Sequence, residues 1–167
     1  AALAGFFDQL DARFGELDIL VNVVGGTFKA PFTDSTPKGW DTLIRTNFLH
    51  VVDATWMAIS RMRATGRGGS IVNFTTIEAH RAAPDFAVYS AMKAAVTQFA
   101  RTLSVELAPE GIRINNVAPD ITPTPGMVGV GGTSAVTVSD PVGTRIATPM
   151  GRTGVLGDVS NCVLFLA

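Results

Sequence analysis

The sequence of 167 residues has few of the side chains that build cross-links and metal sites. Its single cysteine, Cys162, excludes an internal disulfide framework and a cysteine-based zinc site. Two histidines, His50 and His80, leave little for a histidine-rich metal centre, so we expect no metal. The 13 basic and 14 acidic residues nearly cancel, which excludes a strongly basic nucleic-acid face and a polybasic membrane patch.

Long hydrophobic runs are also missing. No segment reaches the ~18 consecutive apolar residues that a membrane helix needs, and the first ten residues lack the basic start of a signal peptide. We therefore expect a cytoplasmic protein with no membrane and no nucleic acid among its partners. The chain begins at an alanine inside a helical pattern and stops within an apolar run, so we expect a piece of a longer protein.

The residues that are present predict an α/β protein. Hydrophobic residues make up 47% of the chain, which is enough for the core of a single domain. Short runs rich in β-branched residues predict buried strands over 18–24, 70–74 and 112–117. Apolar residues at helical spacing predict helices over 3–14, 34–64, 88–108 and 158–167. Strands that alternate with long helices predict a parallel sheet covered on both faces.

Ligands of such a sheet bind at the carboxyl ends of its strands, so the residues that follow the strands are candidates for chemistry. Thr76 follows the second predicted strand, and the next helix begins with Tyr89 and Lys93 on one face. An ammonium near a phenol favours the phenolate, so we expect Lys93 to lower the pKa of Tyr89. Tyr89 would then exchange protons near neutral pH, with the Thr76 hydroxyl on the same reacting oxygen. An isolated Tyr-x-x-x-Lys pair more often lies on a solvated helix face.

Several motifs, taken in order, resemble those of the short-chain dehydrogenase/reductase family. They are LDILVNVVGG (17–26), RTNF (45–48), GGSIVNFTT (68–76), YSAMK (89–93), GIRINNVAPD (111–120) and GRTGVLGDVSNCVLFLA (151–167). The resemblance implies a Rossmann-like, doubly wound parallel sheet in a single partial domain over 1–167, with a substrate-side loop over 118–150. The family's first βαβαβ half, with its Gly-x-x-x-Gly-x-Gly phosphate loop, and its last strand have no counterpart here, so we expect an incomplete dinucleotide site.

The resemblance implies four catalytic residues. Tyr89 would be the general acid for ketone reduction or the base for alcohol oxidation. Lys93 would lower the pKa of Tyr89 and bind the ribose hydroxyls beside the nicotinamide. Thr76 would orient and polarise the substrate carbonyl, and Asn47 would hold a water that links Lys93 to solvent.

The resemblance also implies NAD or NADP as the cofactor, without deciding between them. Besides Tyr89 and Lys93, the residues implied at the cofactor are Asn22, Gly25, Pro119, Ile121 and Thr124. Asn22 and Gly25 would lie toward the adenosine side, and Asn22 would also tie neighbouring strands together. The Ile121 backbone and Thr124 would bind the carboxamide, and Pro119 belongs to the turn beside the nicotinamide.

Three positions depart from the family's pattern. Thr76 stands where serine is usual, which keeps a donor and an acceptor, so we expect retuned activity rather than loss. The usual Asn-Asn-Ala-Gly reads Asn-Val-Val-Gly over 22–25, which removes one polar contact near the cofactor. The usual Pro-Gly turn reads Pro119-Asp120, which places a carboxylate near the cofactor. We expect the nearby Glu78 and Asp85 to be solvated.

We interpret the chain as part of an NAD(P)-dependent oxidoreductase that interconverts a ketone and a secondary alcohol by hydride transfer. The small-molecule carbonyl or alcohol would be its main partner. The alternative is a non-catalytic, cofactor-deficient module for oligomerisation or ligand binding; the absent glycine-rich half favours it, whereas the presence of Asn47, Tyr89 and Lys93 together opposes it. The two long helices are apolar over more than one stripe, which predicts a homodimer or homotetramer.

Overall fold

The computed structural model describes residues 2–124 and 150–167. Within these residues three parallel strands form one sheet in the order in which they occur along the chain. They are β1 (Ile19–Asn22), β2 (Gly69–Phe74) and β3 (Ile112–Val117). The predicted parallel sheet is thus confirmed. The predicted loop over 118–150 lies for the most part outside the described residues.

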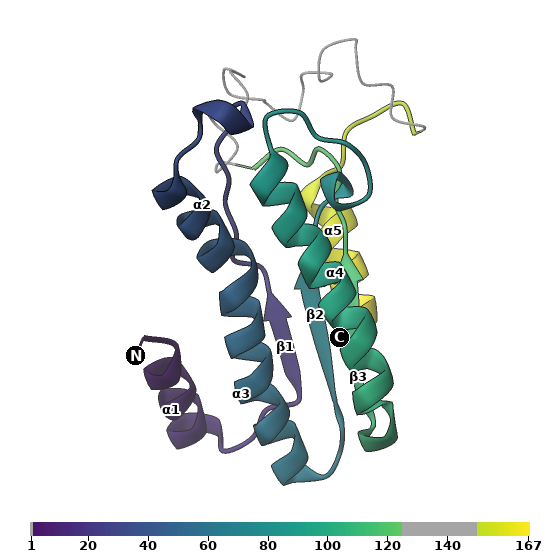
Figure 1. Cartoon of the computed structure of the whole chain (residues 1–167). Coiled ribbons are helices and arrows are strands. Elements are labelled where there is room, and N and C mark those ends of the chain that lie inside the picture. Colours follow the sequence, from purple (N-terminus) through teal and green to yellow (C-terminus); the bar gives the residue numbers. More distant parts are fainter. Residues whose placement is uncertain (1, 125–149) are drawn as a thin grey trace.

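Helices cover both faces of this sheet. The described part of the chain contains the α-helices α1 (Ala2–Phe14), α2 (Pro37–Ile44), α3 (His50–Thr65), α4 (Ala87–Leu107) and α5 (Leu156–Leu166). Short 3₁₀ turns occur at η1 (Phe32–Asp34), η3 (Ile77–Ala79) and η4 (Ala108–Glu110). Figure 1 shows α3 and α4 in front of the sheet and α5 behind it. This layering is the way in which a parallel sheet removes both faces from water.

The helix predicted over 34–64 has an irregular middle. Thr36 caps its start, since the Thr36 Oγ1 accepts from the Gly39 N–H at 3.2 Å, and Pro37 occupies the first helical position. Between α2 and α3 the chain widens into one π turn, η2 (Arg45–Leu49), without leaving helical backbone. The π turn carries Asn47, whose side chain is fully buried. π turns of this kind occur frequently at functional sites.

The core lies between the strands and the helices α1, α3 and α4. Its buried side chains are Phe7, Ala54, Ala58, Met62, Ile71, Ala100, Leu107, Ile112 and Ile114. Phe7 anchors α1, and the Arg61 guanidinium lies over its ring at 4.7 Å from the centroid. Arg61 also pairs with Asp11 of α1 at 2.6 Å. Burial of this apolar surface is the main force that holds the layers together.

Three asparagines in register cross the sheet near the carboxyl ends of its strands. Asn22 lies opposite Asn73, and Asn73 lies opposite Asn116. The Asn22 Nδ2 donates to the Asn73 Oδ1 at 2.8 Å, and the Asn73 Nδ2 donates to the Asn116 Oδ1 at 3.3 Å. Because Asn22 and Asn73 are buried, these bonds satisfy amides that would otherwise be costly to remove from water. Asn22 therefore ties β1 to β2.

Two glycines on the loop between α3 and β2 provide a test of this packing. Gly66 and Gly68 both have positive φ, at 67° and 81°. An added Cβ at Gly66 meets nothing within 4 Å, whereas one at Gly68 overlaps the backbone carbonyl of Gly111. We expect Gly66→Ala to lower the free energy of unfolding by about 1–2 kcal/mol through backbone strain. Gly68→Ala should cost about 1–3 kcal/mol more, because of the overlap.

Urea unfolding of the whole protein that carries this chain measures both variants. Gly66→Ala is the matched control, since it shares the left-handed backbone but not the overlap. Equal losses for the two variants would show that β2 and the turn before β3 are not packed as described.

Candidate active site

Four of the residues predicted from the sequence meet near the carboxyl ends of the strands. Thr76 comes two residues after β2, Tyr89 and Lys93 lie one turn apart on α4, and Asn47 lies on the π turn. Asn47, Thr76 and Lys93 are buried, and Tyr89 is half-buried. The fold thus brings together side chains that are up to 46 residues apart in the sequence.

Lys93 reaches from α4 to the end of β2. Its Nζ donates to the Phe74 carbonyl oxygen at 2.9 Å, and only 3% of the residue is exposed. Burial lowers the pKa of Lys93 from its usual 10.5 to about 8. An ammonium has three donors, and the described part of the chain occupies one of them. Lys93 therefore has two donors for oxygen atoms of a ligand.

Gly25, in the loop after β1, lies beside the Lys93 ammonium. A Cβ added at Gly25 would lie 3.1 Å from the Lys93 Nζ and 3.1 Å from the Asn47 Oδ1. The Asn47 Nδ2 donates to the carbonyl oxygens of Gly26 at 2.8 Å and Leu43 at 3.0 Å, and its Oδ1 accepts from the Gly26 N–H at 3.2 Å. Asn47 thus fastens the loop after β1 to α2, and Gly25 keeps the space beside Lys93 open. The water expected between Asn47 and Lys93 stays a prediction.

Tyr89 differs from the expectation in its ionisation. Burial disfavours the phenolate and raises the pKa of Tyr89 above its usual 10; a hydrogen bond with the Thr76 hydroxyl lowers it in part, and the Glu78 carboxylate raises it further. The prediction that Lys93 lowers this pKa is therefore wrong for this structure, in which the Lys93 Nζ donates to the Phe74 carbonyl. Tyr89 is protonated at neutral pH, which is the form that donates a proton.

Glu78 belongs to the site, although the sequence predicted a solvated side chain. The Thr76 hydroxyl donates to the Glu78 Oε2, and the Glu78 N–H points back at the same hydroxyl at 3.5 Å. Burial raises the pKa of Glu78, but hydrogen bonds from Thr76 and Arg81 outweigh it and leave that pKa below its usual 4.5. Thr76 caps the turn η3, and Glu78 lies in its first turn. The Thr-x-Glu spacing after a strand is the signal in the sequence that could have revealed this contact.

Asp120 takes part in an ion-pair chain instead of lying open beside a cofactor. The Arg81 Nη2 lies 2.8 Å from the Glu78 Oε1 and 3.3 Å from the Asp120 Oδ1. The Asp120 Oδ1 also accepts from the Ile121 N–H at 2.8 Å. Arg81 therefore offsets the charge of the carboxylate that replaces the family's usual glycine.

Two of the remaining residues predicted at the cofactor already make backbone hydrogen bonds within the chain. The Ile121 N–H is already donated to Asp120, and the Ile121 carbonyl accepts from the Gly154 N–H at 3.0 Å. The Pro119 carbonyl accepts from the Ile77 N–H at 3.1 Å, and Thr124 is exposed. Their cofactor contacts, and a cofactor contact of the buried Asn22, stay predictions.

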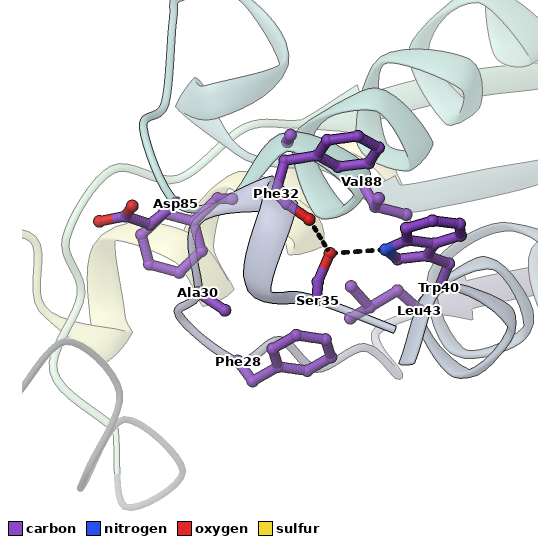
Figure 2. Close-up of a pocket in the computed structure, with 10 residues that line it drawn as sticks. Phe28, Ala30, Phe32, Ser35, Trp40, Leu43, Asp85 and Val88 are labelled. Carbon is purple, nitrogen blue, oxygen red and sulfur yellow. Dashed lines mark hydrogen bonds between the residues drawn. The ribbon is translucent and has the colours of Figure 1, made fainter. Parts of the chain in front are cut away.

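An aromatic pocket lies against the start of α4. Its aromatic lining consists of Phe28, Phe32, Trp40 and Phe86. Figure 2 shows Ser35 between Phe28 and the pair Phe32 and Trp40, where its Oγ accepts from the Trp40 Nε1 at 2.6 Å and donates to the Phe32 carbonyl at 2.6 Å. Asp85, expected in solvent, lines the same pocket and pairs with Lys29 at 3.6 Å. Phe86 of this lining contacts Tyr89, with 6.4 Å between the two ring centroids, so a largely apolar surface adjoins the site.

The described residues show neither a metal cluster nor a membrane helix. No group of three or more His, Cys, Asp or Glu side chains among them is placed to hold a metal ion. Similarly, within 2–124 and 150–167 no helix is long and apolar enough to cross a membrane.

The buried charge of Lys93 predicts an unusual dependence of stability on pH. Because the folded pKa of about 8 lies below the unfolded value of 10.5, the unfolded chain binds more protons between these pH values. The free energy of unfolding should therefore rise by about 2–3 kcal/mol from pH 8 to pH 10.5, over and above other titrations. Lys93→Met should abolish this rise, and the exposed control Lys38→Met should keep it. Urea titrations of the cofactor-free protein across this range measure it; an identical rise in Lys93→Met would show that Lys93 is not buried as a cation.

Comparisons with known proteins identify the family that this chain resembles. A family model described as Enoyl-(Acyl carrier protein) reductase matches residues 1–167. An uncharacterized oxidoreductase of Schizosaccharomyces pombe is 36% identical over 156 residues, which are 93% of this chain and 51% of that protein. Carbonyl reductase (NADPH) 2 of Sus scrofa is 32% identical over 152 residues, which are 91% of this chain and 61% of the relative.

A solved structure extends the likeness to the fold. The crystal structure of a gluconate 5-dehydrogenase from Burkholderia cenocepacia, in complex with NADP and tartrate, matches with a TM-score of 0.84 at 28% identity. The match covers 99% of this chain and 63% of that protein. The Rossmann-like α/β fold is thus confirmed. The chain spans 51% to 63% of the length of the first relatives that it matches.

Proposed function

This chain belongs to the short-chain dehydrogenase/reductase family, and we propose that the protein carrying it is an NAD(P)-dependent oxidoreductase that interconverts a ketone and a secondary alcohol. The observation that carries the proposal is the convergence of a protonated phenol, a threonine hydroxyl and a buried ammonium at the carboxyl ends of parallel strands. General acid–base chemistry on an oxygen atom needs such a phenol, and Lys93 places a buried ammonium one helical turn away on α4.

A bound nicotinamide would supply a hydride to the carbonyl carbon in reduction and accept it back in oxidation. In reduction, Tyr89 gives its phenolic proton to the carbonyl oxygen while Thr76 contacts the same oxygen. In oxidation, the Tyr89 phenolate takes the proton of the alcohol. The buried surroundings of Thr76 and Lys93 strengthen these interactions, because charges interact more strongly away from water.

The residues present fit the ribose of a nicotinamide nucleotide. Lys93 has two donors to offer, and Gly25 keeps the space beside the Lys93 Nζ clear of a side chain. A ribose diol presents two adjacent hydroxyl oxygens, which match these donors. The pig relative is named for NADPH and the solved relative holds NADP, which supports a nicotinamide cofactor. NAD and NADP both stay candidates.

The aromatic pocket beside Tyr89 supports a substrate with an apolar group. Association through α3 and α4 into a homodimer or homotetramer is part of the proposal, since Trp56 and Val105 on these helices are 72% and 75% exposed. A cytoplasmic location stays a prediction. The competing proposal is a non-catalytic module for oligomerisation or ligand binding, and the acid–base groups assembled around Tyr89 speak against it.

A turnover assay of the whole protein tests the proposal. Purified protein is mixed with NADH or NADPH and a panel of small apolar and polar ketones, and oxidation of the reduced cofactor is followed. We expect oxidation that requires both the protein and a ketone. No turnover with either cofactor, in a protein that binds one of them, would favour the non-catalytic alternative.

A further inference from the structure

We propose that Glu78 is a positioning residue that holds the hydroxyl proton of Thr76, so that the site accepts an alcohol in preference to a ketone. The inference rests on the proposed function, and it assigns to that site a bias between the two sides of the reaction. It follows from which partner donates in each hydrogen bond of the site.

The Thr76 hydroxyl has one proton to give, and its direction is set by Glu78. An ionised carboxylate only accepts hydrogen bonds. The Glu78 Oε2 lies within hydrogen-bond distance of the Thr76 Oγ1, so Thr76 must be the donor. Because the acceptor is charged, this bond is stronger than one between neutral groups. The Thr76 oxygen therefore presents lone pairs, and no proton, to anything else that approaches it.

Tyr89 enters the same site from α4, and its phenol keeps its proton at neutral pH. The phenol can therefore donate to an oxygen atom of a substrate, whereas the Thr76 proton is already directed to Glu78. A substrate oxygen that reaches both side chains thus meets one donor, the Tyr89 phenol, and one acceptor, the Thr76 oxygen.

An alcohol and a ketone meet these two groups differently. An alcohol oxygen can accept from Tyr89 and donate its own proton to the lone pairs of Thr76, so both contacts are satisfied. A ketone oxygen only accepts, so it gains the bond from Tyr89 but faces the lone pairs of Thr76. To donate to the ketone, Thr76 must turn away from Glu78 and give up a charge-assisted bond.

The carboxylate is held in place by its own partners. The Arg81 Nη2 pairs with the Glu78 Oε1 at 2.8 Å, which leaves the Oε2 for Thr76. Asp120 holds Arg81 from the loop after β3, at 3.3 Å. The Glu78 side chain is 25% exposed, so it is partly shielded from competing water. Glu78 is therefore fixed at Thr76 by contacts from two loops.

The test compares Glu78→Gln with Glu106→Gln, a glutamate on the exposed face of α4. In glutamine the amide nitrogen can donate to Thr76, which frees the Thr76 proton for a ketone. Dissociation constants are measured in two unreactive complexes of the whole protein, an alcohol with reduced cofactor and the matching ketone with oxidised cofactor. These complexes cannot react, so they report binding alone. Turnover rates would not serve, because the equilibrium constant of the overall reaction fixes the ratio of the forward and reverse kinetic constants.

We expect Glu78→Gln to lower the ratio of the ketone dissociation constant to the alcohol dissociation constant by about five- to tenfold. The ketone then binds more tightly relative to the alcohol. Glu106→Gln should leave the ratio unchanged. Arg81→Gln, which removes the ion pair but keeps the carboxylate, should give a smaller shift of the same sign and serves if Glu78→Gln does not fold. If the parent protein reduces ketones and the ratio is unchanged in the folded variants, the role of Glu78 is overturned. The proposed function is then unaffected. A parent protein that binds cofactor but reduces no ketone would overturn the proposed function and this inference together.

Discussion

Tyr89→Phe will lower the turnover of the whole protein by about two to four orders of magnitude and leave its cofactor affinity almost unchanged. The substitution removes one hydroxyl and keeps the ring, which lies 6.4 Å from the ring of Phe86 in an edge-to-face arrangement. The hydroxyl carries the proton that the reacting oxygen must receive. The burial that raises the pKa of Tyr89 keeps this proton in place at neutral pH.

Steady-state kinetics and a cofactor titration, on the same preparation, separate the two effects. Phe86→Leu is the control for packing, because it removes the neighbouring ring and no proton donor. If Tyr89→Phe kept near-normal turnover, the assignment of Tyr89 as the acid and base would be wrong.

Thr76→Val will nearly abolish turnover, by about two orders of magnitude, whereas Thr76→Ser will keep or raise it. Valine has the shape of threonine without the hydroxyl, so it removes the contact to the reacting oxygen. It also leaves the half-buried Glu78 carboxylate without one of its donors. Serine keeps that hydroxyl and removes only the methyl group, which occupies volume on the substrate side.

Rates with one small and one bulky ketone complete this test. Thr76→Ser should gain more on the bulky ketone, because the methyl group that it lacks would crowd that substrate. Equal rates for Thr76→Val and the parent would show that this side chain is structural, and the non-catalytic alternative would then come first.

The strands could be predicted closely because short runs rich in β-branched residues stand between glycine-rich or polar breaks. β2 and β3 lie within one residue of their predicted bounds. β1 is shorter than expected, since Val23 and Val24 leave the sheet and are 57% and 66% exposed. An apolar pattern indicates which residues can be buried. It does not indicate where the pairing with the adjacent strand ends. The π turn at Asn47 has no signature in the apolar spacing. Tertiary packing decides where the helix takes up one extra residue.

The site shows where prediction from spacing ends. The spacing of Tyr89 and Lys93 placed both on one helix face, but their ionisation depends on burial and on where each head group points. Lys93 donates to the end of β2, and Tyr89 is more affected by its own burial than by that charge. Arg81 and Asp120 are 39 residues apart, so only the fold reveals their contact.

The central claim is that this site transfers a hydride to a carbonyl carbon with Tyr89 as the proton donor. The most direct measurement uses a nicotinamide cofactor deuterated at the transferred position, with mass spectrometry of the alcohol formed by the whole protein and by Tyr89→Phe. The account predicts one deuterium on the carbinol carbon for each cofactor oxidised by the parent protein, and almost no labelled alcohol from the variant under conditions in which it still binds the cofactor. An alcohol without deuterium, or equal labelling by the two proteins, would contradict it.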